Sequence, residues 1–372
     1  MAESKSDLFT YIQRIGKYSF AEKAFNSVDA LVLSQIVYMK FDEIIPLLKH
    51  HSEHSHHDPS VHALHPILLS NILQLPEAES IFSDPVYGEL YRRMLELICE
   101  STRYGGTSMG CYTNCVDSEL EHQFCGMLLH LPEDAPAPYF VAFRGTDETI
   151  VGWKENFNMA YLRKIPSQAM STSFLEKIAE RTSGQIIVAG HSKGGNLSIY
   201  SSACIPVSMQ HRILSVYSFD GPGFTPSFYH KTGFQNIESR IQKIIPEHSI
   251  IGLLFSTRHS CRTIQSYANG LSQHDPLTWK IVGDDFVDQS GIRRPAYHRA
   301  QRINHWMQRM SSHERKHFID TTFELLRSTE AGTVYELGKH PFQLIGKILH
   351  DIFHWKRDKR KLYHASMRKY FG

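Results

Sequence analysis

The sequence predicts an α/β fold, a mostly parallel central sheet with helices on both faces. Between residues 124 and 268, short runs of β-branched and aromatic residues alternate with helix-compatible segments. Polar and glycine-rich loops follow several of these runs, as the functional loops of parallel sheets do. The 372 residues, 41% of them hydrophobic and 21% charged, suffice for one large α/β domain with insertions or for two domains.

Residues 1–100 are expected to form a helical segment that packs on the core. Two stretches within it are compatible with helices, an apolar one at 28–38 and an amphipathic one at 84–100. A third stretch has an apolar face at helical spacing, formed by Leu8, Tyr11, Ile12 and Ile15.

Residues 101–295 are expected to contain the sheet. The candidate strands are residues 124–130, 139–143, 186–189, 214–219, 240–245 and 262–268. A proline-rich turn joins the first two, and helix-compatible segments separate later ones. This alternation favours parallel pairing with helices on both faces.

A serine bracketed by glycines follows the candidate strand at 186–189. The five residues Gly190-His-Ser-Lys-Gly194 match the G-x-S-x-G pattern and precede a helix-compatible segment. A sharp turn there would present Ser192 Oγ clear of the backbone, and glycines remove the Cβ atoms that would collide. The pattern therefore predicts a nucleophile elbow. The alternative is a glycine-rich turn that only packs closely.

A serine nucleophile needs a histidine base and an acid that orients it. In α/β hydrolases the acid and then the base follow the nucleophile along the chain. His274 lies just beyond the last candidate strand and is the expected base. Asp220 and Glu247 each end a later strand, so either carboxylate could serve, and we favour Asp220. His191 is expected to support the elbow.

The oxyanion donors are expected from two places. The N–H of Lys193 opens the helix after the nucleophile, where the helix dipole is positive. The second N–H is expected in the loop after residues 139–143, where Gly145 and Thr146 lie. Thr146 could also donate its hydroxyl.

Two motifs together resemble the class 3 lipase group of α/β hydrolases: Phe143-Arg-Gly-Thr146, and Gly190-His-Ser-Lys-Gly-Gly195. Further segments look like the bacterial Mbeg1-like family: Asn26–Ser34, Phe219–Phe224, Pro246–Gly252 and Gln273–Pro276. The resemblance runs from about residue 7 to about residue 330. It implies an α/β-hydrolase fold and a lipase- or esterase-like activity on poorly defined substrates.

The sequence departs from the lipase pattern at two points. Lys193 stands where lipases usually carry leucine, which places a cation beside the nucleophile. The strand-end acid expected of lipases has no unambiguous aspartate, and Glu247 lies in its neighbourhood.

Residues 296–372 are expected to form a helical extension with a basic tail. An apolar stripe between Leu344 and Phe353 runs into the basic residues 356–361. Such a helix could contact an anionic membrane surface or could dock on the domain. Segments 1–100 and 296–372 are both candidates for pocket walls or lids, and the sequence does not choose between them.

Composition gives little reason to expect a charged partner or a metal. The formal charge is +2, so no general attraction to nucleic acid is implied. The start of the chain lacks the apolar region of a signal peptide, no stretch approaches the roughly 18–20 apolar residues of a membrane span, and the six scattered cysteines are typical of reduced thiols. We therefore expect a cytoplasmic protein without cofactor or metal. The histidine-rich residues 50–58 are a weaker candidate for metal binding.

Two functional hypotheses follow. The first is a serine hydrolase of carboxylic esters, in particular lipidic ones, although a triad does not by itself exclude a thioester or peptide substrate. The second is a non-catalytic protein of the same fold that binds a partner or a membrane. Reactivity of Ser192 separates them, because only an activated serine reacts with fluorophosphonates.

Overall fold

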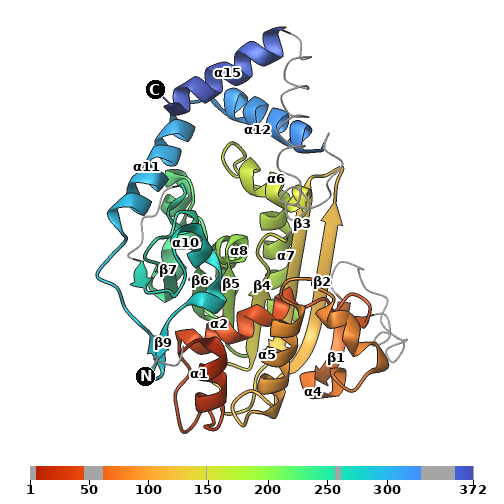
Figure 1. The fold of residues 1–372 in the computed structure, drawn as a ribbon. Coiled ribbons are helices and arrows are strands. Elements are labelled where there is room, and N and C mark those ends of the chain that lie inside the picture. Colours follow the sequence, from red (N-terminus) through yellow and green to blue (C-terminus); the bar gives the residue numbers. More distant parts are fainter. Residues whose placement is uncertain (1–5, 46–61, 148, 256–260, 328–356, 372) are drawn as a thin grey trace.

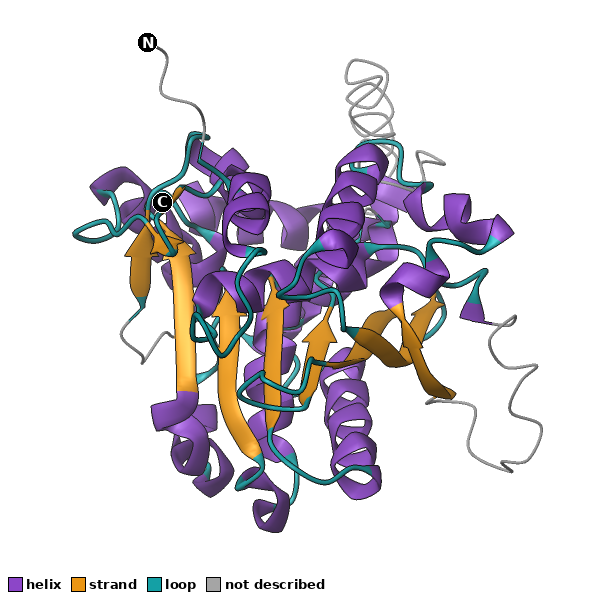
Figure 2. Ribbon diagram, turned by 90° about the horizontal axis from the view of Figure 1, so that it is seen from below, coloured by secondary structure: helices purple, strands orange, loops and turns teal. Residues whose placement is uncertain are grey.

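The structure, a computed structural model, describes residues 6–45, 62–147, 149–255, 261–327 and 357–371. Within this part of the chain, eight strands form one sheet in sequence order, and strands β4 to β8 are parallel (Figure 2). The strands are β1 (His62–Leu68), β2 (Ser108–Asp117), β3 (His122–His130), β4 (Tyr139–Phe143), β5 (Ile186–His191), β6 (Ile213–Phe219), β7 (Ile241–Pro246) and β8 (Arg262–Ile264), with a separate ribbon of β9 (Ile281–Val282) and β10 (Asp285–Phe286). The predicted α/β fold with a mostly parallel sheet is confirmed.

Helices flank the sheet and extend beyond it. They are α1 (Leu8–Ile15), α2 (Ser27–Gln35), α4 (Leu69–Ile72), α5 (Gly88–Glu100), α6 (Ile150–Asn158), α7 (Pro166–Arg181), α8 (Lys193–Cys204), α9 (Val207–Gln210), α10 (Thr232–Ile237), α11 (Arg294–Gln308), α12 (Ser312–Arg327) and α15 (Arg357–Phe371). In Figure 1 the red and orange N-terminal helices lie against the sheet, and the blue C-terminal helices stand beyond one end of its strands.

The two faces of the sheet bury two different cores. Because the parallel strands follow one another in sequence order, right-handed crossovers place their connecting helices on one face, where α7, α8 and α10 pack. The N-terminal helices α1, α2 and α5 cover the other face. Side chains of β4 alternate accordingly: Phe140 and Ala142 join the N-terminal helices, whereas Val141 and Phe143 join α7 and α8.

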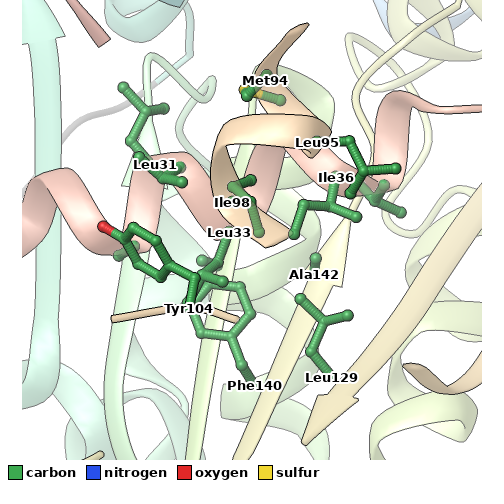
Figure 3. Close-up of a cluster of buried hydrophobic side chains, with 14 of the residues drawn as sticks. Leu31, Leu33, Ile36, Met94, Leu95, Ile98, Tyr104, Leu129, Phe140 and Ala142 are labelled. Atoms are coloured by element: carbon green, nitrogen blue, oxygen red, sulfur yellow. The ribbon is translucent and has the colours of Figure 1, made fainter. Parts of the chain in front are cut away.

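The N-terminal helices are an integral part of the core. Figure 3 shows leucine and isoleucine side chains of α2 and α5 meeting Leu129, Phe140 and Ala142 of the sheet. A fully buried ion pair adds to this packing: Arg103 Nη2 and Nε donate to the two carboxylate oxygens of Asp29 at 2.6 and 2.7 Å. The Tyr11 hydroxyl donates to the same carboxylate at 3.0 Å. These bonds join α1, α2 and the segment after α5.

The segment expected to be helical up to residue 100 also supplies a strand, β1. It pairs antiparallel with β2, which was not expected either. The sequence of β2 includes glycine, asparagine and two cysteines, so its propensity for a strand is weak. Pairing with β3 along its whole length stabilises it in spite of that propensity. The helices expected after residue 296 are present as α11 and α12.

Two features expected from the sequence lie outside the described residues, namely the histidine-rich residues 50–58 and the apolar stripe 344–353. None of the described helices combines the length and the apolar character needed to cross a bilayer. Among those same residues, no group of three or more His, Cys, Asp or Glu side chains is placed to hold a metal ion. None of the six cysteines forms a disulfide.

Candidate active site

Ser192 occupies a strained turn between β5 and α8. Its backbone has φ 58° and ψ −128°, a region that residues with a side chain rarely adopt. The turn depends on the two flanking glycines. A Cβ on Gly190 would lie 2.4 Å from the Gly194 carbonyl carbon, and one on Gly194 would lie 2.0 Å from the Phe143 carbonyl oxygen. Only glycine fits at these two positions.

Ser192, His274 and Asp220 form a continuous chain of hydrogen bonds. Ser192 Oγ lies 2.9 Å from His274 Nε2, and His274 Nδ1 lies 2.6 Å from Asp220 Oδ2. Asp220 directly follows β6 and is buried, and its other carboxylate oxygen accepts a hydrogen bond from Ser249 Oγ. His274 ends a 3₁₀ helix, Gly270–His274, beyond β8. The carboxyl ends of parallel strands therefore bring the three side chains together.

Glu247, the other acid that the sequence left open, makes a different contact. Its carboxylate accepts a hydrogen bond from Arg293 Nε at 2.5 Å, and its carbonyl oxygen accepts one from the Arg293 N–H at 2.8 Å. Arg293 is the residue before α11, so Glu247 fixes the start of that helix. Of the two candidate acids, Asp220 is the one that contacts His274.

His191 and Tyr38 connect the two loops around Ser192. Tyr38 Oη accepts the Gly145 N–H at 3.0 Å and lies 3.1 Å from His191 Nδ1, to which it donates. His191 Nε2 then donates to the His274 carbonyl oxygen at 2.7 Å. Burial, together with the nearby His274, lowers the pKa of His191 to about 3, so the ring stays neutral. His191 thus supports the elbow, as expected, whereas no signal in the sequence singled out Tyr38.

The oxyanion donors expected from the sequence need one correction. The Gly145 N–H already donates to the Tyr38 hydroxyl, so it is engaged and is a weaker candidate for an oxyanion donor. Glycine is required here for close approach, since a Cβ would lie 3.0 Å from Ser192 Cβ and 2.5 Å from Tyr38 Oη. The N–H groups of Thr146 and Lys193 remain as candidates, the latter at the start of α8 where first-turn N–H groups have no intrahelical partner. The Thr146 hydroxyl accepts a hydrogen bond from Asn156 Nδ2.

The charged amino group of Lys193 forms an ion pair within the protein. Its Nζ is fully buried and donates to Glu155 Oε2 at 2.9 Å and to the backbone and side-chain oxygens of Gln123 at 2.6 and 2.8 Å. Burial lowers the pKa of Lys193, and the Glu155 carboxylate opposes that shift. The ion pair therefore neutralises the expected cation and anchors the residue whose N–H is a candidate oxyanion donor. Sequence reasoning identified neither Glu155 nor Gln123.

The sequence matches the Mbeg1-like family over residues 98–324, more than half of the chain, from the end of α5 to α12. The chain belongs to the Mbeg1-like family. This confirms the resemblance seen in the motifs, and the matched segment contains Ser192, Asp220 and His274.

The similarity to a solved structure is weaker. A crystal structure of M37 lipase is similar over 46% of this Mbeg1-like chain at 17% identity, with a TM-score of 0.34. The chain spans 65% of the length of that lipase. No curated protein matches the sequence.

An apolar pocket of about 790 Å³, including space open to solvent, begins at Ser192 in this Mbeg1-like protein. Its wall comes from α6, from the loops after β6 and β7, and from α11 and α12, which Figure 1 shows beyond the strand ends. Trp153 and Phe157 of α6 are partly exposed at this wall. Of the two segments left open by the sequence, the C-terminal extension supplies the pocket wall.

Proposed function

We propose that this protein is a serine hydrolase that cleaves carboxylic esters with apolar acyl chains. The observation that carries the proposal is the chain of hydrogen bonds from Ser192 through His274 to Asp220. In this order of contacts, His274 accepts the Ser192 proton as the hydroxyl oxygen attacks the ester carbonyl. Asp220 holds His274 in the tautomer protonated at Nδ1 and stabilises the imidazolium that forms.

The negative charge that develops on the carbonyl oxygen needs donors fixed in advance. We assign this role to the N–H groups of Lys193 and Thr146. His274 then donates its proton to the departing alcohol, and water releases the acyl group from Ser192 in a second cycle of the same proton transfers. The apolar lining of the pocket next to Ser192 favours an ester whose acyl part is largely a hydrocarbon chain.

We expect fluorophosphonate probes to label the wild-type protein and to leave Ser192→Ala unlabelled. We also expect hydrolysis of 4-nitrophenyl esters, with kcat/KM rising from acetate to medium chains because longer chains bury more apolar surface in the pocket. Labelling followed by mass spectrometry and a chain-length series from acetate to palmitate test this. A folded protein that neither reacts nor turns over, even with detergent present, would contradict the proposal and leave the non-catalytic hypothesis.

We infer a second property, contact with an anionic lipid surface, from the outer face of α11. From Arg293 to Arg309 this segment carries five arginines and two histidines and no acidic residue, although the whole chain has a formal charge of only +2. Ala296, Ala300 and Asn304 face the protein, whereas all five arginines and both histidines are exposed: Arg293, Arg294, His298, Arg299, Arg302, His305 and Arg309. Of these arginines, Arg293 also pairs with Glu247. From the sequence, the basic C-terminal helix was the candidate for this membrane contact. In the structure, the C-terminal helix α15 packs beside α11 and α12.

The double variant Arg299→Glu/Arg302→Glu is expected to bind phosphatidylglycerol vesicles at least about tenfold more weakly than the wild type, since each basic residue near such a surface contributes about 1 kcal/mol. The control Lys17→Glu/Arg181→Glu makes the same charge change at two other exposed positions. Lys17 follows α1, and Arg181 ends α7. Co-sedimentation with phosphatidylglycerol and phosphatidylcholine vesicles measures both. Equal losses in the two double variants would show a general charge effect and would contradict a specific surface on α11.

A further inference from the structure

The pocket next to Ser192 contains one cation that no carboxylate of the described residues neutralises. Among the described residues that line the pocket, Lys193 and Arg315 are the charged ones. Lys193 is buried against Glu155 and contributes no net charge to the pocket. Arg315, in the first turn of α12, is different.

Among the described residues, the Arg315 side chain makes one hydrogen bond. Its Nη2 donates to Ser312 Oγ at 3.3 Å. Its Nε is shielded from solvent and has no hydrogen-bond partner in the described structure. A buried N–H of a charged group is costly to leave without an acceptor, and such groups are almost always satisfied. The guanidinium therefore has donor capacity that the described residues do not use, at a position that lines the pocket.

Neighbouring carboxylates of α12 are already engaged elsewhere. Glu314 accepts a hydrogen bond from Lys369 Nζ at 2.6 Å. Asp320 pairs with Lys154 Nζ at 3.1 Å and also with Lys316. Neither side chain is within ion-pair distance of Arg315, so neither neutralises the guanidinium charge.

The surroundings of Arg315 favour an anionic ligand that also has an apolar part. Trp306, Met310 and Phe318 line the same pocket, and in such surroundings a charge-assisted hydrogen bond is stronger than in water. A guanidinium offers a planar fork of donors that matches the two oxygens of a phosphate or a carboxylate. An apolar chain with one anionic group satisfies both features of the site.

We propose that the pocket binds amphiphilic anionic esters, with Arg315 holding the anionic group and the apolar wall holding the chain. Cleavage of such esters rests on the proposed hydrolase function, whereas their binding does not depend on it. Arg315 is thus a specificity-determining residue, and its ligand is a phosphate or carboxylate carried on an acyl or alkyl chain.

Binding can be tested without catalysis in the Ser192→Ala protein, because Trp153 and Trp306 line the pocket and report occupancy by fluorescence. The probes are octyl phosphate, the neutral octanol of equal chain length, and inorganic phosphate. We expect octyl phosphate to bind about tenfold to a hundredfold more tightly than octanol, as one charge-assisted contact allows. The preference should fall to about threefold or less in Arg315→Gln, and persist in Arg315→Lys and in the control Arg181→Gln, an exposed arginine on α7.

Equal binding of octyl phosphate and octanol, or a preference that survives Arg315→Gln, would overturn the proposal. Tight binding of inorganic phosphate alone would also overturn it, because the site would then recognise a free anion. Hydrolysis of 4-nitrophenyl decanoate and of mono-4-nitrophenyl sebacate, which adds a terminal carboxylate, gives the catalytic comparison. No turnover of either ester with the binding preference intact would contradict the hydrolase function alone.

Discussion

Asp220→Asn is expected to lower kcat for 4-nitrophenyl esters by about 10⁴-fold while the protein stays folded. The substituted asparagine would keep the shape of the aspartate, and its carbonyl oxygen could still accept the hydrogen bond that Ser249 Oγ donates to Asp220. Its amide nitrogen would then face His274 Nδ1 as a donor. The imidazole would be protonated at Nε2 instead, and this tautomer cannot accept the Ser192 proton.

Glu247→Gln is the matched control, because Glu247 also follows a parallel strand but pairs with Arg293. It removes one charge from the same edge of the sheet without touching His274, and we expect kcat to change by less than about tenfold. Steady-state kinetics on both variants, with circular dichroism as a check of folding, give the comparison. If kcat fell by a similar factor in both variants, Asp220 would not be the triad acid.

Comparison of the two acids shows what the sequence could and could not predict. The elbow is local: a buried strand, two glycines and a helix within 12 residues specify the turn at Ser192. The acid is not local. Asp220 and Glu247 end neighbouring strands, β6 and β7, and both have the same context in the sequence. What separates them is Arg293, which pairs with Glu247, and no periodicity or motif shows that pair.

The residues that sequence reasoning missed share the same cause. Tyr38 bonds to Gly145 across 107 positions, and Glu155 bonds to Lys193 across 38. Each is an ordinary residue in its own segment, and its role arises only from the packing of distant elements. The strand β2 was missed because its stability comes from β3 and not from its own composition.

Packing also decides the wall of the pocket. Segments 1–100 and 296–372 are both helical in part and amphipathic, so their patterns alone do not distinguish a core element from a cap. The sequence order of the parallel strands places the crossover helices on one face and leaves the other to α1, α2 and α5. Helices α11 and α12 of the C-terminal segment line the pocket together with α6.

The largest expected effect on stability comes from Glu155→Gln. Glu155 and Lys193 are both fully buried, and removal of one partner of a buried ion pair leaves an uncompensated charge that costs about 3–5 kcal/mol of unfolding free energy. The Glu155 carboxylate also accepts two backbone N–H groups, from Ser167 at 2.9 Å and from Gln123 at 3.1 Å, one on each oxygen. Glutamine has one acceptor oxygen, so the variant loses one of these bonds as well as the charge. Urea unfolding, with equal slopes in the two proteins, measures the loss of stability.

The double variant Lys193→Met/Glu155→Gln provides the control, because it removes the buried cation as well. We expect it to recover most of the lost stability, giving a coupling energy of at least about 2 kcal/mol between the two sites.

The stability of the single variant Glu155→Gln should also depend on pH. Without Glu155, burial lowers the Lys193 pKa further below its unfolded value. Between these two pKa values the unfolded state binds more protons, so the deficit of Glu155→Gln should shrink as pH rises from 7 to about 9.5. A deficit that is independent of pH and unchanged in the double variant would mean that the loss comes from packing and not from a buried charge.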